Sequence, residues 1–267
     1  MKQILQFFLF TFLVSWAFFW TAVVFSGPTM TPFISVLVLL GTITPAIVAL
    51  LLAAIEGSAG ALVSRILEGN VGLPWYAFAI FYMLTIKLSV AVVYRAWMGT
   101  WPRFGTESWM IIAIAILFST PVQAGEELGW RGYALPQLAK RLGYSGASLL
   151  LGIIWGIWHL PLFFIGGTDK FGQSIIVFVA GTTALSVAIA WLYIHVNGSL
   201  LLTMLMHSAV NQTVGVVPSA AEGARNPYVL SNSLVAWLTV ALLWICSAYF
   251  LARLRKFDFS SAANRPA

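Results

Sequence analysis

Two adjacent glutamates, Glu126 and Glu127, occur in a chain that has only eight acidic residues among 267. They begin the stretch EELGWRGYALPQL, in which Arg131 follows Glu127 by four residues. On a helix this spacing places Glu127 roughly 40° from Arg131 around the axis, whereas Glu126 points roughly 140° away from it. One carboxylate can therefore pair with the guanidinium while the other faces a different group. The alternative is a helix that begins at the membrane interface, where acidic residues in the first turn are favourable and solvated.

Two further polar elements lie in hydrophobic sequence. His159 ends the motif WGIWH, four residues after Trp155, and Pro161 is expected to bend or end the helix just beyond it. His207 and Asn211 are also four residues apart, so they share one helix face. Ionisable side chains inside a membrane are candidate functional groups. The alternative is structural, because His and Asn also hold membrane helices together through hydrogen bonds.

These groups together have the chemistry of a hydrolase, provided that a helical bundle brings them to one cavity. A carboxylate shielded from bulk water, such as Glu126, can act as a general base toward a water molecule. A neighbouring histidine can share or relay the proton, and His with Asn can donate hydrogen bonds to a developing oxyanion. The sequence has no Gly-x-Ser-x-Gly motif, and its one cysteine, Cys246, lies far from the histidines along the chain. No activated nucleophile therefore competes with the carboxylate.

The elements that must position these residues are membrane helices. Hydrophobic residues make up 60% of the chain and charged residues 8%, and the mean hydropathy is +0.92, whereas about a quarter of the residues of a soluble domain are charged. Apolar runs near the roughly 20 residues that a spanning helix needs lie at about 4–25, 33–55, 75–97, 109–123, 145–165, 173–195, 199–217 and 233–252. The sequence therefore predicts an all-α fold, a polytopic membrane bundle of about eight transmembrane helices.

We expect one integral membrane domain over residues 1–256 and a short polar tail over 257–267. Counting Lys and Arg by loop in an alternating topology places nine on the side of the N-terminus and four on the other side. Because cytoplasmic loops carry the excess of these residues, both termini and the segment 124–144 are expected to face the cytoplasm. The same topology, with anionic lipid, explains the net charge of +6, so no nucleic-acid partner is expected.

Lys87 lies near the middle of the third apolar run and must face the bundle or water. We expect a structural partner for it, with one of the carboxylates as the alternative. Two other functions remain open for the polar cluster as a whole. One is a non-catalytic transporter or scaffold that binds a solute or helix, although the sequence shows no inverted repeat. The other is haem binding by His159 and His207.

The sequence resembles the CPBP family, the type II CAAX prenyl endopeptidase and bacteriocin-processing (Abi) group of intramembrane proteases. The resemblance covers about residues 110–215. It rests on three elements. The EExxxR element is here Glu126, Glu127 and Arg131, and the FxxxH-type element is WGIWH, which ends at His159. The HxxxN element runs from His207 to Asn211. Trp155 stands where the family pattern has Phe, so an aromatic residue is kept on the face that carries His159.

This resemblance implies an endopeptidase with a cavity in the bilayer that opens to the cytoplasmic side. By matching positions, Glu126 is the catalytic base, His159 assists it, and His207 and Asn211 stabilise the oxyanion. Glu127 and Arg131 hold the site together. The resemblance implies membrane lipid and a peptide or lipidated protein as partners, and it leaves open whether the substrate is a prenylated C-terminus, a leader peptide or a bacteriocin.

Metal dependence is open at this point. Members of the family are often described as metalloproteases, and Glu126, His159 and His207 are candidate ligands that would leave a water position on a zinc ion. However, no HExxH motif is present and the three residues lie on separate segments, so spacing alone does not define a ligand set. We favour direct activation of water by the carboxylate without a cofactor, with zinc as the alternative.

Overall fold

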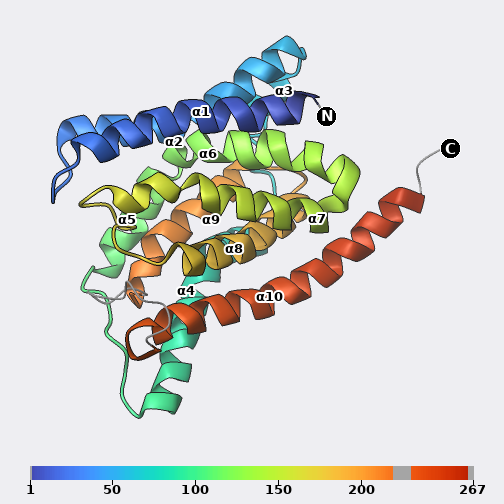
Figure 1. Ribbon diagram of the computed structural model, residues 1–267. Helices are drawn as coiled ribbons and strands as arrows, with labels where there is room; N and C mark the ends of the chain where they lie inside the picture. Colours follow the sequence, from blue (N-terminus) through green and yellow to red (C-terminus); the bar gives the residue numbers. More distant parts are fainter. Residues whose placement is uncertain (1, 219–229, 264–267) are drawn as a thin grey trace.

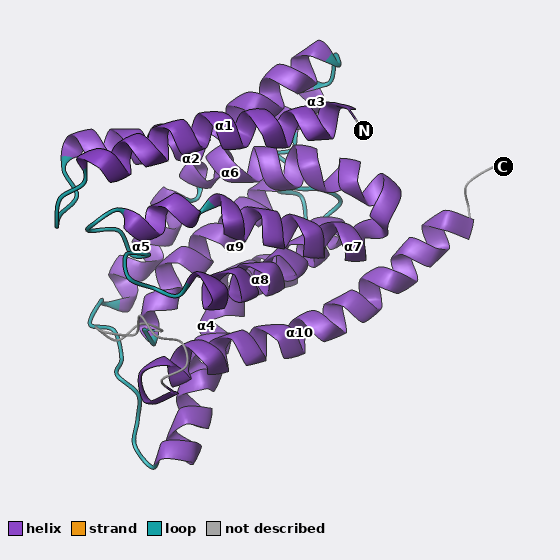
Figure 2. Cartoon of the chain, viewed as in Figure 1, coloured by secondary structure: helices purple, strands orange, loops and turns teal. Residues whose placement is uncertain are grey.

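The computed structural model describes residues 2–218 and 230–263, and this part of the chain contains helices and loops but no strand (Figures 1 and 2). The longer helices are α1 (Lys2–Phe25), α2 (Pro32–Ile55), α4 (Leu73–Met98), α7 (Leu135–Trp158), α8 (Ile175–His195) and α10 (Leu230–Ala263). The shorter ones are α3 (Ala59–Ser64), α5 (Trp109–Ser119), α6 (Ala124–Glu127) and α9 (Leu200–Thr213). Between them lie the 3₁₀ turns η1 (Pro121–Gln123), η3 (Leu160–Phe164) and η4 (Val214–Val216) and the π-helix η2 (Leu128–Ala134). The predicted all-α fold is confirmed.

The predicted polytopic membrane bundle is also confirmed. Six helical segments of the described chain are long and apolar enough to span a membrane, and α5 and α9 add two shorter apolar helices. Large apolar side chains in the middle of these helices face outward, such as Leu13 at 59%, Ile47 at 47% and Ile245 at 66% exposed. An outer surface of this kind suits lipid rather than water. The last helix continues to Ala263, so residues 257–263 extend α10, and 264–267 lie outside the described residues.

The fourth predicted span ends too early. The helical backbone continues from α5 through η1, α6 and η2 into α7, and the chain folds back only at Gly143, which has φ 64° and ψ 170° (Figure 1). Residues 125–135 are therefore buried helix inside the bundle rather than part of a loop, and the exposed part of the segment is the turn that follows Lys140. Glu126 and Glu127 lie inside the bundle, with 6% and 0% of their surface exposed. A hydropathy average treats such charges as the end of a span, because it takes no account of partners that compensate them within the protein.

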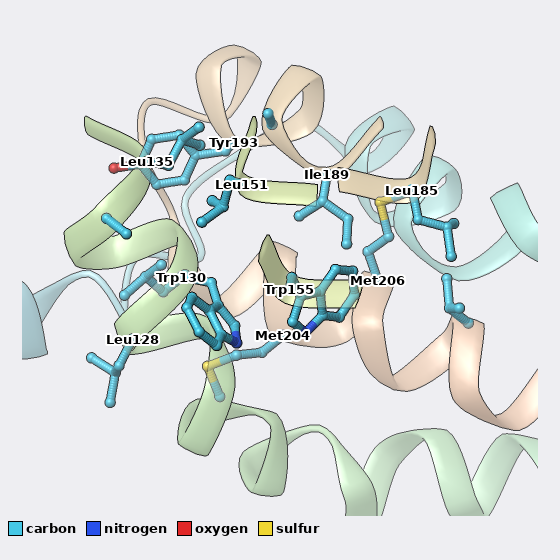
Figure 3. Packing of buried hydrophobic residues seen from close by; sticks show 14 of the residues in the cluster. Leu128, Trp130, Leu135, Leu151, Trp155, Leu185, Ile189, Tyr193, Met204 and Met206 are labelled. Atoms are coloured by element: carbon cyan, nitrogen blue, oxygen red, sulfur yellow. The ribbon is translucent and has the colours of Figure 1, made fainter. Parts of the chain in front are cut away.

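The core joins the segment 124–142 to α7, α8 and α9. Trp130, Trp155, Met204 and Met206 lie together in it, and Figure 3 shows these side chains in the buried cluster. The helices α7 and α8 approach so closely at Gly152 that a Cβ atom there would lie 2.6 Å from Thr183 Cα. This packing brings the three polar elements of the sequence into one region.

The loops of the bundle gather at two ends. Gly105 N donates to Val216 O at 3.0 Å, and Gly166 lies against Gly27, so the connections 26–31, 99–108, 165–174 and 214–218 meet at one end, on the left in Figure 1. We call these four connections the rim end.

At the other end, Leu200 N donates to Arg65 O at 2.9 Å, and Tyr133 Oη donates to Glu56 Oε1 at 2.6 Å. The connections 56–72 and 196–199 and the turn at Gly143 lie here, and we call them the opposite end. The first and last described residues lie on this side as well (Figure 1).

Candidate functional site

A buried ion pair forms the base of the site. Arg131 Nη1 donates to Glu127 Oε1 at 2.8 Å, and both side chains are fully buried. This is the pair predicted from their four-residue spacing. The same oxygen, Oε1 of Glu127, also lies 2.9 Å from His207 Nδ1 on α9. Because a carboxylate accepts hydrogen bonds, Nδ1 of His207 carries the hydrogen. The Glu127 carboxylate is thus compensated from two different elements.

Glu126 lies in a different environment. Its Oε2 accepts a hydrogen bond from Trp155 Nε1 at 2.7 Å, so this carboxylate faces a group other than Arg131, as the sequence predicted. It keeps 6% of its surface exposed, whereas Glu127 has none. Of the two adjacent glutamates, only Glu126 can therefore reach a water molecule or a substrate.

Trp155 links the three polar elements, a role that the sequence interpretation missed. The guanidinium carbon of Arg131 lies 4.3 Å from the centre of the Trp155 ring, a distance at which a cation is attracted to the π face. The ring also makes edge contacts with His159 and His207, at centroid distances of 5.7 and 5.3 Å. The signal was present in the sequence, because Trp in place of the family's Phe adds an N–H donor.

His159 occupies the end of α7. The helix stops at Trp158 and gives way to η3, which contains Pro161, as predicted. His159 Nδ1 lies 2.8 Å from the carbonyl oxygen of Trp155, and because a carbonyl only accepts, Nδ1 carries the hydrogen. The other ring nitrogen, Nε2, then has a free lone pair when the ring is neutral. His159 is therefore arranged to accept a proton at Nε2.

A cavity of about 390 Å³ lies beside this cluster. Trp155, His159, His207 and Asn211 line its polar side. The apolar wall comes from α4, α8 and α10 and includes Met83, Val177, Phe178, Leu185, Val240 and Leu243. The glutamates are not part of the lining, and Glu126 approaches the cavity through the Trp155 side chain to which it is bonded. The structure thus gathers all six candidate residues at one cavity and its adjacent charge cluster.

The sequence interpretation placed both termini and the mouth of the active site on the cytoplasmic side. The cavity opens at the rim end, where its lining residues Asp169, Asn211 and Gly215 are exposed, whereas the first and last described residues lie at the opposite end (Figure 1). The structure assigns neither end to a side of the membrane, so the predicted orientation stays a prediction.

The candidate zinc ligands do not form a ligand set in this geometry. Within residues 2–218 and 230–263, no three His, Cys, Asp or Glu side chains are grouped as ligands of one metal ion. His159 and His207 each use Nδ1 for a hydrogen bond within the protein, which leaves Nε2 of each ring for another partner, and Glu126 uses Oε2 for Trp155. Direct activation of water by Glu126, the route followed below, and activation by zinc both stay predictions.

Lys87, the lysine inside the third predicted span, has a structural contact. Its Nζ donates to Thr239 Oγ1 of α10 at 3.2 Å, and the Lys87 side chain is completely buried. This contact links α4 to α10, in agreement with the structural partner that we expected.

The fold and site define an all-helical membrane protein with a buried Glu, Arg and His cluster beside an interhelical cavity. Residues 106–213 match the family model described as Rce1-like, type II CAAX prenyl endopeptidase. A curated relative, the CAAX prenyl protease 2 of Methanococcus maripaludis, is 32% identical over 114 residues, which are 40% of this chain and 41% of the relative. The chain therefore matches about two fifths of that relative's length. The resemblance to the CPBP family is confirmed, and the matching segment 106–213 carries all six candidate site residues.

Proposed function

We propose that the chain is an intramembrane endopeptidase that hydrolyses membrane-associated or lipidated peptides and proteins with a water activated by Glu126. The observation that carries this proposal is the placement of Glu126. It is the one partly accessible carboxylate of the pair, it is fixed by Trp155, and it adjoins a cavity lined by two histidines and an asparagine. The match of the surrounding segment to CAAX-type proteases supports the same chemistry.

The reaction follows from the donors and acceptors at the cavity. Glu126 takes a proton from a water molecule, whose oxygen forms a bond with the carbonyl carbon of the peptide. The resulting oxyanion accepts hydrogen bonds from the Asn211 amide and, when His207 carries a hydrogen on Nε2, from that N–H, while Glu127 holds Nδ1–H of the same ring. The C–N bond then breaks, and the amine leaves with the proton that Glu126 took from the water, relayed through Nε2 of His159. Water is consumed, and a carboxylic acid and an amine are produced.

A comparison of cellular peptides tests this proposal without a known substrate. Membrane and secreted peptides are compared between cells that produce the wild type and cells that produce Glu126→Ala, at matched protein levels. We expect new peptide termini only with the wild type, because Glu126 is the base that the reaction requires. Glu68→Ala is the matched control, since Glu68 is exposed at the opposite end, and it should give the wild-type set of peptides. Identical peptidomes from folded wild type and Glu126→Ala would instead support a binding or transport role for the cluster.

Trp155→Phe is expected to slow Glu126-dependent cleavage by about tenfold or more. Phe keeps an aromatic ring at the position but removes the N–H that fixes Glu126 Oε2, and a hydrogen bond to a charged group is worth about 1.5–3 kcal/mol. The measurement is the cleavage rate on a peptide found in the peptidome comparison, with kcat and KM determined separately. The effect should fall on kcat, because Trp155 positions the base. An unchanged kcat would show that the indole N–H has no positioning role.

A further inference from the structure

The carbonyl oxygen of Trp158, the last residue of α7, cannot be capped in the usual way by the residues that follow it. A carbonyl at the end of a helix accepts from the backbone N–H three or four residues later. Three residues later stands Pro161, which has no N–H, and the N–H of Leu162 donates to His159 O at 2.9 Å instead. Because Trp158 is only 1% exposed, its carbonyl needs a donor from another part of the protein.

Trp16 of α1 supplies this donor. Its Nε1–H donates to Trp158 O at 3.0 Å, across 142 residues of sequence. The ring of Phe19, on the same helix, packs edge-on against the ring of Trp158 at a centroid distance of 5.3 Å. The helix α1 lies along α2 (Figure 1), and Ser15 Oγ donates to Gly41 O of α2 at 2.8 Å. The donor is therefore held in place from both sides.

The capped carbonyl belongs to the peptide unit that leads into His159. This unit is planar, and its other end, the N–H of His159, donates to Gly156 O at 3.3 Å. The His159 ring bonds through Nδ1 to Trp155 O and lies 4.7 Å from the ring of Trp158. A tilt of the peptide unit would therefore move Nε2 of His159, the atom that relays the proton in the proposed reaction.

We infer that Trp16 is a positioning residue for His159. It acts on the reaction through the backbone at the end of α7, and the inference rests on the proposed function because it assigns Trp16 a part in the proton relay. Trp16 lies outside the segment 106–213 that matches the family model. The first helix is thus a working part of the site as well as a membrane-spanning segment.

Three variants of α1 test this role. Trp16→Phe keeps an aromatic ring but removes the N–H. Trp16→His restores a donor, because Nε2 of an imidazole has the same place in its five-membered ring as Nε1 of an indole, and it carries the hydrogen in one neutral tautomer. Trp20→Phe is the matched control, since the Trp20 ring also contacts η3, where it stacks on Phe164 at 5.7 Å.

Each purified, folded variant is measured in detergent in two ways. The first is kcat and KM on a peptide found in the peptidome comparison. The second is hydrogen exchange of the backbone amides in residues 156–165, which reports how firmly the end of α7 is held. The exchange measurement needs no substrate, so it is independent of proteolysis.

We expect Trp16→Phe to lower kcat by about tenfold with KM near the wild-type value, because a displaced catalytic group slows the chemical step more than it weakens binding. Exchange in residues 156–165 should become faster. Trp16→His should recover part of the lost kcat, and Trp20→Phe should match the wild type in both measurements. A role in packing alone predicts the reverse order of the two Trp16 variants, since Phe replaces an indole in an apolar contact better than His does.

A wild-type kcat in Trp16→Phe, a kcat of Trp16→His no higher than that of Trp16→Phe, or an equal loss in Trp20→Phe would overturn the inference. If Trp16→Phe does not fold, Trp16→His decides: a kcat near the wild-type value supports the role of the donor, and a failure to fold shows that α1 contributes only packing. Absence of Glu126-dependent cleavage by the wild type would refute the proposed function and the catalytic role of Trp16 together. The exchange measurement would still show whether Trp16 holds the end of α7.

Discussion

Arg131→Met is expected to lower the free energy of unfolding by about 3–5 kcal/mol, the loss found when one member of a buried ion pair is removed. Both Arg131 and Glu127 have no exposed surface, and their 2.8 Å contact lies inside the bundle. Met retains much of the side-chain volume over the Trp155 ring, so the main change is a carboxylate that keeps only His207 as a partner. The measurement is equilibrium unfolding of the purified protein in mixed detergent micelles.

The double variant Arg131→Met with Glu127→Gln is the matched control. It removes both charges, and the Gln oxygen can still accept the hydrogen bond from His207 Nδ1. We expect it to be more stable than Arg131→Met alone, because no uncompensated charge remains in the interior. A double variant as unstable as the single one would show that the contact of Arg131 with Trp155, rather than its charge, stabilises this region.

Local parts of the site could be predicted from the sequence. The contact of Glu127 with Arg131 follows from a spacing of four residues on a helix, and the end of α7 beside His159 follows from Pro161, which cannot continue a helix. The membrane-spanning runs follow from hydropathy, since lipid-facing and buried side chains are both apolar. Each of these predictions depends only on residues close together along the chain.

The rest depends on contacts between distant segments. His207 reaches Glu127 across 80 residues of sequence, and Trp155 reaches Glu126 across 29. No local pattern specifies these pairs, because the packing of α7, α8 and α9 selects them. The same contacts compensate the charges of the glutamate segment. A hydropathy average does not include such contacts, so it ended the fourth span before this segment.

Glu126→Gln and Glu127→Gln are expected to separate the chemistry of the paired glutamates from their structural role. Glu126→Gln should lower kcat by about 10²–10⁴-fold, the usual contribution of a general base, because an amide cannot take the proton from water. Its stability should stay near that of the wild type, since the amide oxygen can still accept the hydrogen bond that Trp155 donates to Glu126.

Glu127→Gln should have its main effect on stability. It removes the ion-pair partner of the fully buried Arg131 guanidinium, which costs several kcal/mol, while Glu126 keeps its contact with Trp155. Both variants are measured in detergent for unfolding and for kcat on a peptide from the peptidome comparison. If Glu126→Gln retained activity while Glu127→Gln was stable but inactive, the general base would be Glu127. Burial argues against that outcome, because the Glu127 side chain has no exposed surface and its Oε1 is already bonded to Arg131 and His207.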